Sequence, residues 1–169
     1  AEAVVDTLPG YAGSRPVRVG NAAQGQVQLD VFGPVADLIH ALSQHEGRVS
    51  TDDLGLLDAC VEAVAARWHE ADHGIWEIRD RPRHHVHSKV MCWTAVDRAL
   101  AVASAAGAER PMWKQLRDDI AADVLVHGWD AGRGSFVCAY DRVEMDAAVL
   151  HIVLSGLLDD RDPRAAATI

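Results

Sequence analysis

The stretch SKVMCWTAVDRALAVASAAG, residues 88–107, decides the fold class of this chain. Its larger apolar residues recur at steps of three and four, the spacing of one helical face: Val90, Trp93, Val96, Leu100 and Ala103. Gly107 then supplies a helix stop. The stretch therefore predicts a helix over residues 88–106 with an apolar face directed at a core.

The same periodicity predicts four further helices, over about residues 21–44, 50–68, 111–127 and 143–158. Pro34 would kink the first of these helices or shift its start. Ser50 is a suitable cap for the second, and Pro111 is favoured at the first position of its helix. Residues 1–20 are rich in proline and glycine and predict an ordered loop, and residues 128–134 predict a turn. Residues 75–77 and 135–140 predict two extended pieces. Long helices with such connections indicate an all-α domain of antiparallel helix pairs.

Composition excludes several classes of partner. The net charge is −9, and no run of lysine or arginine could follow a phosphate backbone, so nucleic acid is not expected. No apolar stretch reaches the roughly 18 residues of a membrane span. Cys60, Cys92 and Cys138 are odd in number and widely spaced, which favours reduced thiols in a cytoplasmic protein. No leader with a basic and an apolar region is visible at the start.

The candidate chemistry lies in ADHGIWEIR, residues 71–79. One carboxyl group, Glu77, stands among Ile75, Trp76 and Ile78. If these side chains pack around it, loss of hydration raises the pKa of the carboxyl, which can then hold a proton near neutral pH. This is the property that a general acid needs.

Two blocks of sequence resemble glycoside hydrolase family 15, in particular its glucoamylase and trehalase-like members. One is GIWEIR at residues 74–79 followed by SKVM at residues 88–91. The other runs from Leu8 to Asp30 and includes LPGY, RPVR and QLD. Weaker matches continue to Asp162-Pro163-Arg164, so the resemblance covers almost the whole chain.

The resemblance implies an (α/α)6 barrel with its active site among the loops at one end. Five helices cannot close a barrel of twelve, so residues 1–169 are expected to be a partial catalytic domain, truncated at both ends. The implied reaction is inverting hydrolysis of an α-glucosidic bond. The main expectation is a glucoamylase-like enzyme that releases glucose from α-glucans or oligosaccharides, and trehalase is the alternative.

The resemblance also implies roles for single residues. Glu77 matches the proton donor, and Arg18 matches an arginine that holds a glucosyl hydroxyl. Trp76 is either a platform for the sugar or a core residue, and Lys89 is expected to contact the substrate or the surroundings of the acid. Where better-known fungal members carry an aspartate after the arginine, this chain has Val19. The substrate is therefore open, and so is the oligomeric state.

An inverting enzyme needs a second carboxylate, roughly 6.5–9.5 Å from the acid. In the family this base lies on a much later loop, and no matching motif occurs before Ile169. The chain alone is therefore not expected to turn over. Asp30, Asp97 and Asp146 fall within apolar helical patterns and are more typical of structural carboxylates than of a base.

Other sites and functions are weaker alternatives. The group His84, His85 and His87 lacks a second ligand pair, so no metal is expected, and no cofactor motif is present.

Arg79 would lower the pKa of Glu77 if both side chains shared one face of a strand, unless another carboxylate such as Asp72 or Asp80 engaged it. A non-catalytic helical interaction module remains open. So does a sugar lyase or epimerase that uses Tyr11 and the histidine group.

Overall fold

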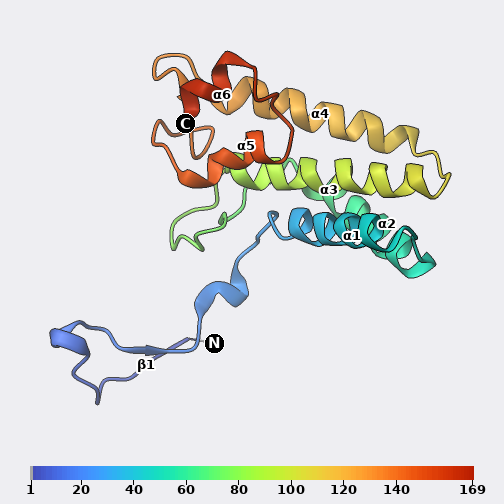
Figure 1. Ribbon diagram of the computed structural model, residues 1–169. Helices are drawn as coiled ribbons and strands as arrows, with labels where there is room; N and C mark the ends of the chain where they lie inside the picture. Colours follow the sequence, from blue (N-terminus) through green and yellow to red (C-terminus); the bar gives the residue numbers. More distant parts are fainter. Residues whose placement is uncertain (1) are drawn as a thin grey trace.

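Residues 2–169 are described by a computed structural model in which helices dominate (Figure 1). The four long helices are α1 (Phe32–Glu46), α2 (Thr51–Arg67), α3 (Val86–Ala105) and α4 (Pro111–His127). Two short helices follow, α5 (His151–Leu154) and α6 (Pro163–Thr168), and a 3-10 helix, η3 (Ala147–Leu150), leads into α5. The prediction of an all-α chain is confirmed.

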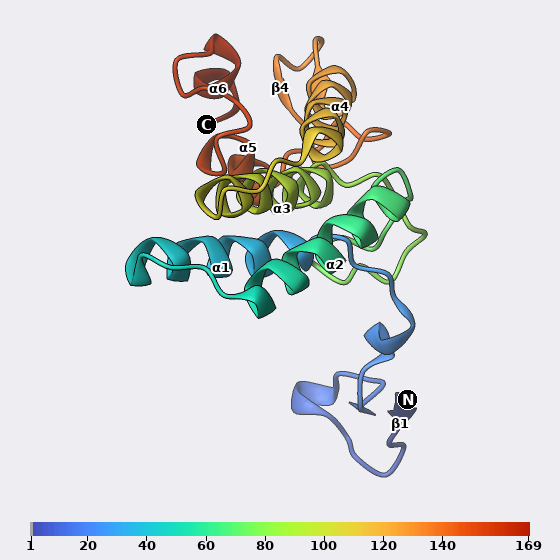
Figure 2. The ribbon, with the colours of Figure 1, turned by 90° about the vertical axis from the view of Figure 1, so that its right-hand side faces the viewer.

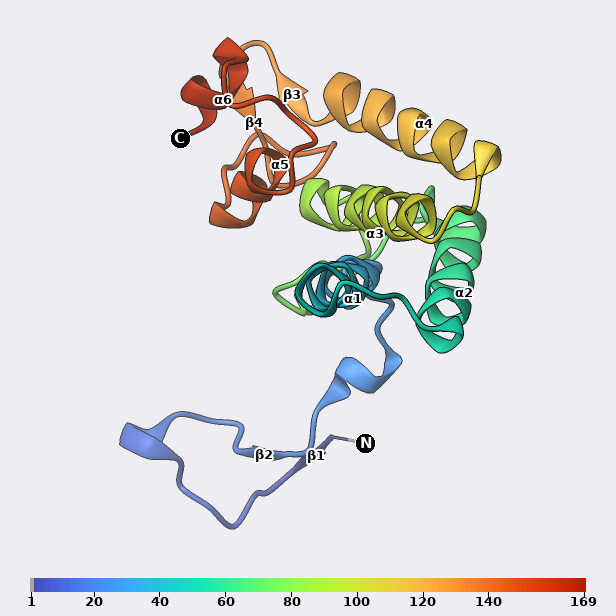
Figure 3. The same ribbon diagram turned by 45° about the vertical axis from the view of Figure 1, so that its right-hand side comes forward.

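Helix α3 is the centre of the packing. It lies between a layer formed by α1 and α2 and a layer that contains α4 and α5 (Figure 2). Every residue from Val86 to Val96 is buried, so this part of α3 is covered on all sides and not only on the predicted face. Figure 3 shows the stack of α1, α3 and α4 with α2 alongside.

The start signals of two helices act as the sequence predicts. The Ser50 hydroxyl accepts a hydrogen bond from the Asp53 amide at 3.1 Å, and the Asp53 carboxylate accepts one from the Ser50 amide at 3.0 Å. This reciprocal pair is a capping box, and it fixes the beginning of α2. Pro111 occupies the first turn of α4, where its missing N–H has no helical partner to lose.

The first helix is shorter than predicted, because it begins at Phe32 and not near Asn21. The Val27 amide donates to the His73 ring and the Leu29 amide donates to the Asp72 carboxylate. These donors are therefore committed to a distant loop and cannot enter a helical ladder. Pro34 lies in the first turn of α1, so the expected shift of the start is confirmed.

The predicted helix over residues 143–158 is also wrong in extent. Only η3 and α5, residues 147–154, are helical, because the Glu144 carbonyl accepts from the Cys138 amide and ties residues 143–146 to another segment. A further short helix, α6, begins at Asp162 and Pro163, beyond the predicted helices. The Asp162 side chain accepts from the Arg164 amide and caps α6, which the sequence analysis missed.

Four two-residue strands form two antiparallel pairs, β1 (Ala3–Val4) with β2 (Arg18–Val19) and β3 (Trp129–Asp130) with β4 (Ser135–Phe136). The first pair belongs to the segment that we call the arm, residues 2–26, which also contains the 3-10 helices η1 (Tyr11–Gly13) and η2 (Ala22–Gly25). The arm extends away from the helical stack (Figure 1). Within residues 2–169, none of the helices combines the length and apolar character that a membrane span requires.

Candidate active site

The loop between α2 and α3, residues 68–85, carries the expected acid, and a buried lysine fixes its beginning. Lys89 is 1% exposed, and its Nζ donates hydrogen bonds to the backbone carbonyls of Trp68 and Glu70. Burial lowers the pKa of this ammonium group. Lys89 therefore joins the first turn of α3 to the end of α2, and its charged atom is used for that contact.

Asp72 and His73 fix the next part of the loop. Asp72 is fully buried, and its backbone pairs with that of Arg83 through two hydrogen bonds of 2.8 Å. Its carboxylate accepts from the Leu29 amide at 3.0 Å, and the His73 amide donates to the Val27 carbonyl at 2.9 Å. The beginning of the loop is thus held in place by the segment that precedes α1.

Gly74 makes the next turn possible. Its φ is +65°, and an added Cβ would meet the His85 ring at 2.9 Å, so both the backbone conformation and the available space require glycine. Residues 74–77 form a turn in which the Glu77 amide donates to the Gly74 carbonyl at 3.3 Å. The expectation of an extended piece over residues 75–77 is therefore wrong.

Glu77 stands at the end of this turn with φ +49°, a left-handed conformation that is uncommon for a residue other than glycine. Its side chain is exposed, as are Ile75, Trp76 and Ile78. The apolar enclosure expected around Glu77 is therefore absent among residues 2–169.

Three side chains of the arm reach the residues around the acid. The Asn21 amide Nδ2 donates to Glu77 Oε2 at 3.2 Å. The Gln26 amide donates to the carbonyls of Glu77 and Ile78, at 3.2 and 3.3 Å. The Glu2 carboxylate accepts from Arg79 at 2.8 Å. The arm and the turn of residues 74–77, which we call the acid turn, are far apart in sequence but lie together at one site.

Glu2 also binds the arginine expected to hold a sugar. Arg18 Nε lies 3.0 Å from Glu2 Oε1, and the Glu2 side chain is only 14% exposed. The Arg79 guanidinium beside Glu2 lowers the pKa of that carboxyl. Arg79 is thus engaged by another carboxylate, as the sequence analysis considered, but that carboxylate is Glu2 and not Asp72 or Asp80. Glu77 and Arg79 also do not share one face of a strand, because Glu77 lies in a turn.

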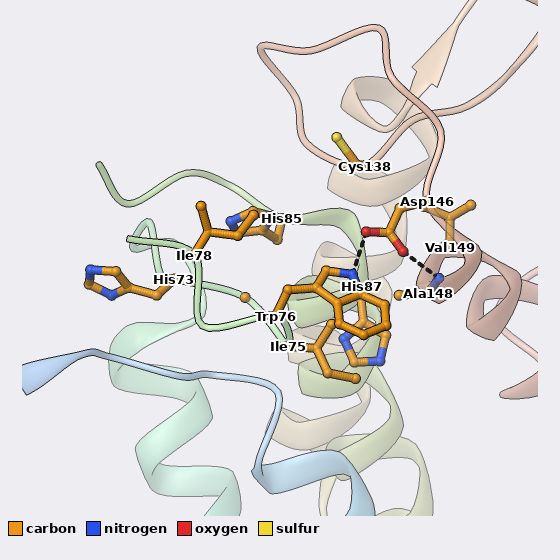
Figure 4. Close-up of a pocket in the computed structure, with 11 residues that line it drawn as sticks. His73, Ile75, Trp76, Ile78, His85, His87, Cys138, Asp146, Ala148 and Val149 are labelled. Carbon is orange, nitrogen blue, oxygen red and sulfur yellow. Dashed lines mark hydrogen bonds between the residues drawn. The ribbon is translucent and has the colours of Figure 1, made fainter. Parts of the chain in front are cut away.

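Trp76 is held at one end and exposed over most of its surface. Its Nε1 donates to Asp146 Oδ2 at 2.5 Å, and Asp146 Oδ1 accepts from the Ala148 amide at 2.8 Å, which caps η3 (Figure 4). The tryptophan is 61% exposed, so it is not a core residue of this segment. A small pocket lies beside it, bordered by the acid turn, the start of α3 and η3.

The three clustered histidines point to different neighbours. The His84 ring stacks on Tyr140, with centroids 5.8 Å apart, and the backbone of His85 bridges to Ala139. His87 is buried against His151, with ring centroids 5.1 Å apart, and burial lowers its pKa to about 4. Within the part of the chain that the structure describes, no group of three or more potential ligands is arranged for a metal ion.

The carboxylates considered as an internal base are mostly engaged elsewhere. Asp97 is paired with Arg98 at 2.7 Å, and Asp146 binds Trp76 and caps η3. Asp30 is half-buried, and loss of hydration raises its pKa. No motif in the sequence predicts Glu2, Asn21 or Gln26 as site residues. Asn21 could have been flagged, since it lies in the block that carries the resemblance, but its contact with Glu77 spans 56 residues.

Comparison with known proteins shows what this chain is similar to. Residues 5–169 match the profile of glycosyl hydrolases family 15. The chain is 38% identical to the trehalase of Mycobacterium tuberculosis over 99% of its own length and 25% of that protein. It is 35% identical to the trehalase of Thermoplasma volcanium over 99% of its length and 27% of that protein. The chain thus spans about a quarter of the length of these relatives.

A solved structure shows the same fold. It is a glycosidase with a glutamate-to-alanine substitution, in complex with glucose. The TM-score is 0.74 at 19% sequence identity, and the match covers 95% of this chain and 45% of the other. The helices described above are therefore arranged as in part of a larger glycosidase fold, consistent with the expected portion of an (α/α)6 barrel.

Proposed function

Because this chain belongs to glycosyl hydrolases family 15, we propose that the full-length protein is a glycosidase that hydrolyses trehalose, with Glu77 as its general acid. The observation that supports trehalose as the substrate is that relatives matching 99% of the chain are named trehalases. Trehalase, the alternative in the sequence analysis, is better supported than the glucoamylase-like reading. The chain spans about a quarter of those relatives, so the activity is proposed for the whole protein.

The exposed position of Glu77 supports its proposed role as proton donor. Its carboxyl is exposed at the end of a turn and is oriented by Asn21, so a glycosidic oxygen can approach it. In an inverting reaction, the acid gives its proton to that oxygen as the bond to the anomeric carbon breaks, and a base activates water on the opposite face.

Arg18 and Trp76 are proposed to bind the glucosyl unit next to Glu77. A guanidinium has five N–H donors, so the contact of Arg18 Nε with Glu2 leaves the terminal nitrogens for a sugar hydroxyl. The exposed Trp76 ring, fixed through Nε1, offers an apolar face to a pyranose. The buried Nζ of Lys89 supports a role beneath the loop, in the surroundings of the acid, more than direct contact with the sugar.

The test is hydrolysis of trehalose, maltose and maltotriose by the full-length protein and by its Glu77→Gln variant. Removal of a general acid typically costs about 10²–10⁴ in rate. Glu109→Gln, which changes an exposed glutamate in the loop before α4, is the matched control. Preference for maltotriose would favour the glucoamylase-like reading, and an active Glu77→Gln variant would exclude Glu77 as the acid.

The anomer of the released glucose tests inversion. Trehalose contains two α-linked glucosyl units, and hydrolysis breaks the bond to only one anomeric carbon. Inversion therefore releases one β-glucose and one α-glucose, whereas retention releases α-glucose from both units. Proton NMR within the first minutes, before mutarotation, distinguishes the two. Absence of hydrolysis and of sugar binding would favour the non-catalytic helical module.

A further inference from the structure

We propose that Asn21 is a positioning residue for Glu77, and that its side-chain amide directs the acidic proton to Oε1. The inference rests on the proposed role of Glu77 as the general acid. Asn21 donates from Nδ2 to Glu77 Oε2 at 3.2 Å, a contact between the arm and the acid turn. Neither the resemblance nor the similarity to the relatives assigns a role to this residue.

The structure fixes which end of the Asn21 amide faces the acid. Asn21 is the cap of η2, and its Oδ1 accepts a hydrogen bond from the Ala23 amide at 2.9 Å. Because an oxygen is needed on that side, the NH₂ group must point the other way, toward Glu77. The cap therefore orients the donor, and the donor orients the carboxyl.

The same part of the arm supports the backbone of the acid. Glu77 has φ +49°, and residues held in such sparsely populated conformations concentrate at functional sites. The Gln26 amide donates to the carbonyls of Glu77 and Ile78, which stabilises this turn. The carboxyl and the backbone of one residue are thus both held from the arm.

This arrangement decides which oxygen of Glu77 can deliver a proton. A protonated carboxyl has one carbonyl-like oxygen, which accepts hydrogen bonds, and one hydroxyl, which donates. Oε2 faces the Asn21 donor and so takes the carbonyl role, which leaves the proton on Oε1. That proton passes to the glycosidic oxygen as the bond to the anomeric carbon breaks, the bonding pair stays on that oxygen, and Glu77 becomes a carboxylate.

Several charged groups on the two segments that meet here are paired with other residues. Arg18 on the arm and Arg79 on the loop are both paired with Glu2. Asp80 is paired with Arg83 at 3.0 Å. Asn21 is a neutral donor, so it orients the carboxyl without adding a charge. A charge introduced at position 21 would act directly on the Glu77 carboxyl.

Two substitutions in the full-length protein separate orientation from capping. Asn21→Ser keeps an oxygen that can cap η2 but lacks a donor long enough to reach Glu77. We expect kcat for trehalose to fall about 10- to 100-fold with KM changed less than about twofold, because a misplaced catalytic group costs up to about 10²-fold. Gln115→Ala, which removes an exposed amide from α4, is the control and should keep the wild-type kcat.

Asn21→Asp keeps the size and the cap but places a carboxylate beside Glu77. The added negative charge disfavours ionisation of Glu77, so its pKa rises and the basic limb of the pH profile of kcat/KM moves to higher pH. If Asn21 only capped η2, Asn21→Ser, which keeps a capping oxygen, would keep the wild-type kcat. That result, alongside an inactive Glu77→Gln variant, would overturn this inference and leave the proposed acid intact. An active Glu77→Gln variant would instead overturn the proposed function.

Discussion

At the scale of single residues, the neighbours of Glu77 matter more than its position in the sequence. The motif indicated an acid among apolar side chains, but the turn places Ile75 and Ile78 at the surface. Arg79 is the cation nearest to Glu77 in sequence, but it is paired with Glu2 and not with Glu77. The sequence could not predict this pairing, since Glu2 and Arg79 lie 77 residues apart.

His87 gives a residue-scale prediction about pH and stability. Burial lowers its pKa from 6.5 to about 4 in the folded protein. Between these values the unfolded chain binds a proton that the folded chain excludes, so stability falls as the pH falls from about 6.5 to about 4. From pH 7.5 to pH 5 the loss due to this group is about 2 kcal/mol, at 1.36 kcal/mol per pKa unit.

We therefore expect His87→Leu to remove part of the acid sensitivity of the full-length protein. The measurement is urea unfolding of wild type and variant at pH 7.5 and pH 5. His84 and His85 also have pKa values lowered by burial, so some acid sensitivity should remain in the variant. His45→Gln, on the exposed end of α1, is the control. An equal loss of stability in wild type and His87→Leu would contradict the prediction.

At the scale of elements, the predictions succeed where local signals dominate. The predicted bounds of α2, α3 and α4 are close to the observed ones, because a capping box, a continuous apolar pattern and a proline mark them. The predictions fail where backbone donors are used by a distant segment. Val27 continues the apolar spacing of α1, yet its amide binds His73 and the nearby Leu29 amide binds Asp72. Periodicity contains no information on such contacts.

Two helical glycines provide a matched prediction on helix packing. An added Cβ at Gly33 in α1 would meet Met91 of α3, including its backbone oxygen at 2.9 Å, whereas a Cβ at Gly55 in α2 meets nothing within 4 Å. Gly33→Ala should therefore cost about 1–3 kcal/mol through overpacking. Gly55→Ala should stabilise by roughly 0.5–1 kcal/mol, because alanine favours the helix.

Urea unfolding of both variants in the full-length protein tests this pair. The two substitutions make the same chemical change in two helices. The test is therefore whether they change the free energy of unfolding in opposite directions, more than by how much. A stable Gly33→Ala variant would mean that α1 and α3 are not in the close contact described here. A destabilised Gly55→Ala variant would mean that other parts of the protein cover that side of α2.

At the scale of the whole molecule, these helices leave apolar surface uncovered. Leu38 and Leu42 on α1 and Leu56 on α2 are each about half exposed or more. Contiguous exposed apolar patches are typical of surfaces that pack against other structure. The chain spans only about a quarter of its curated relatives, and we propose that further helices of a longer protein cover these faces.

The same consideration gives a prediction about residues 1–169 as a separate polypeptide. It contains the proposed acid, Arg18 and Trp76, but the carboxylates considered as an internal base bind other groups or lie half-buried. Inversion needs a base roughly 6.5–9.5 Å from the acid to activate water. We therefore expect no hydrolysis of trehalose by this segment above the rate of its own Glu77→Gln variant.

The measurement compares the segment with the full-length protein at equal molar concentration, after circular dichroism has established that the segment is helical. A helical segment without activity agrees with a base supplied from outside residues 1–169. A helical segment with a rate close to that of the full-length protein would place the base within it. Asp30→Asn and Asp146→Asn would then identify the base, because Asp30 is the carboxylate with a raised pKa and Asp146 lies against Trp76.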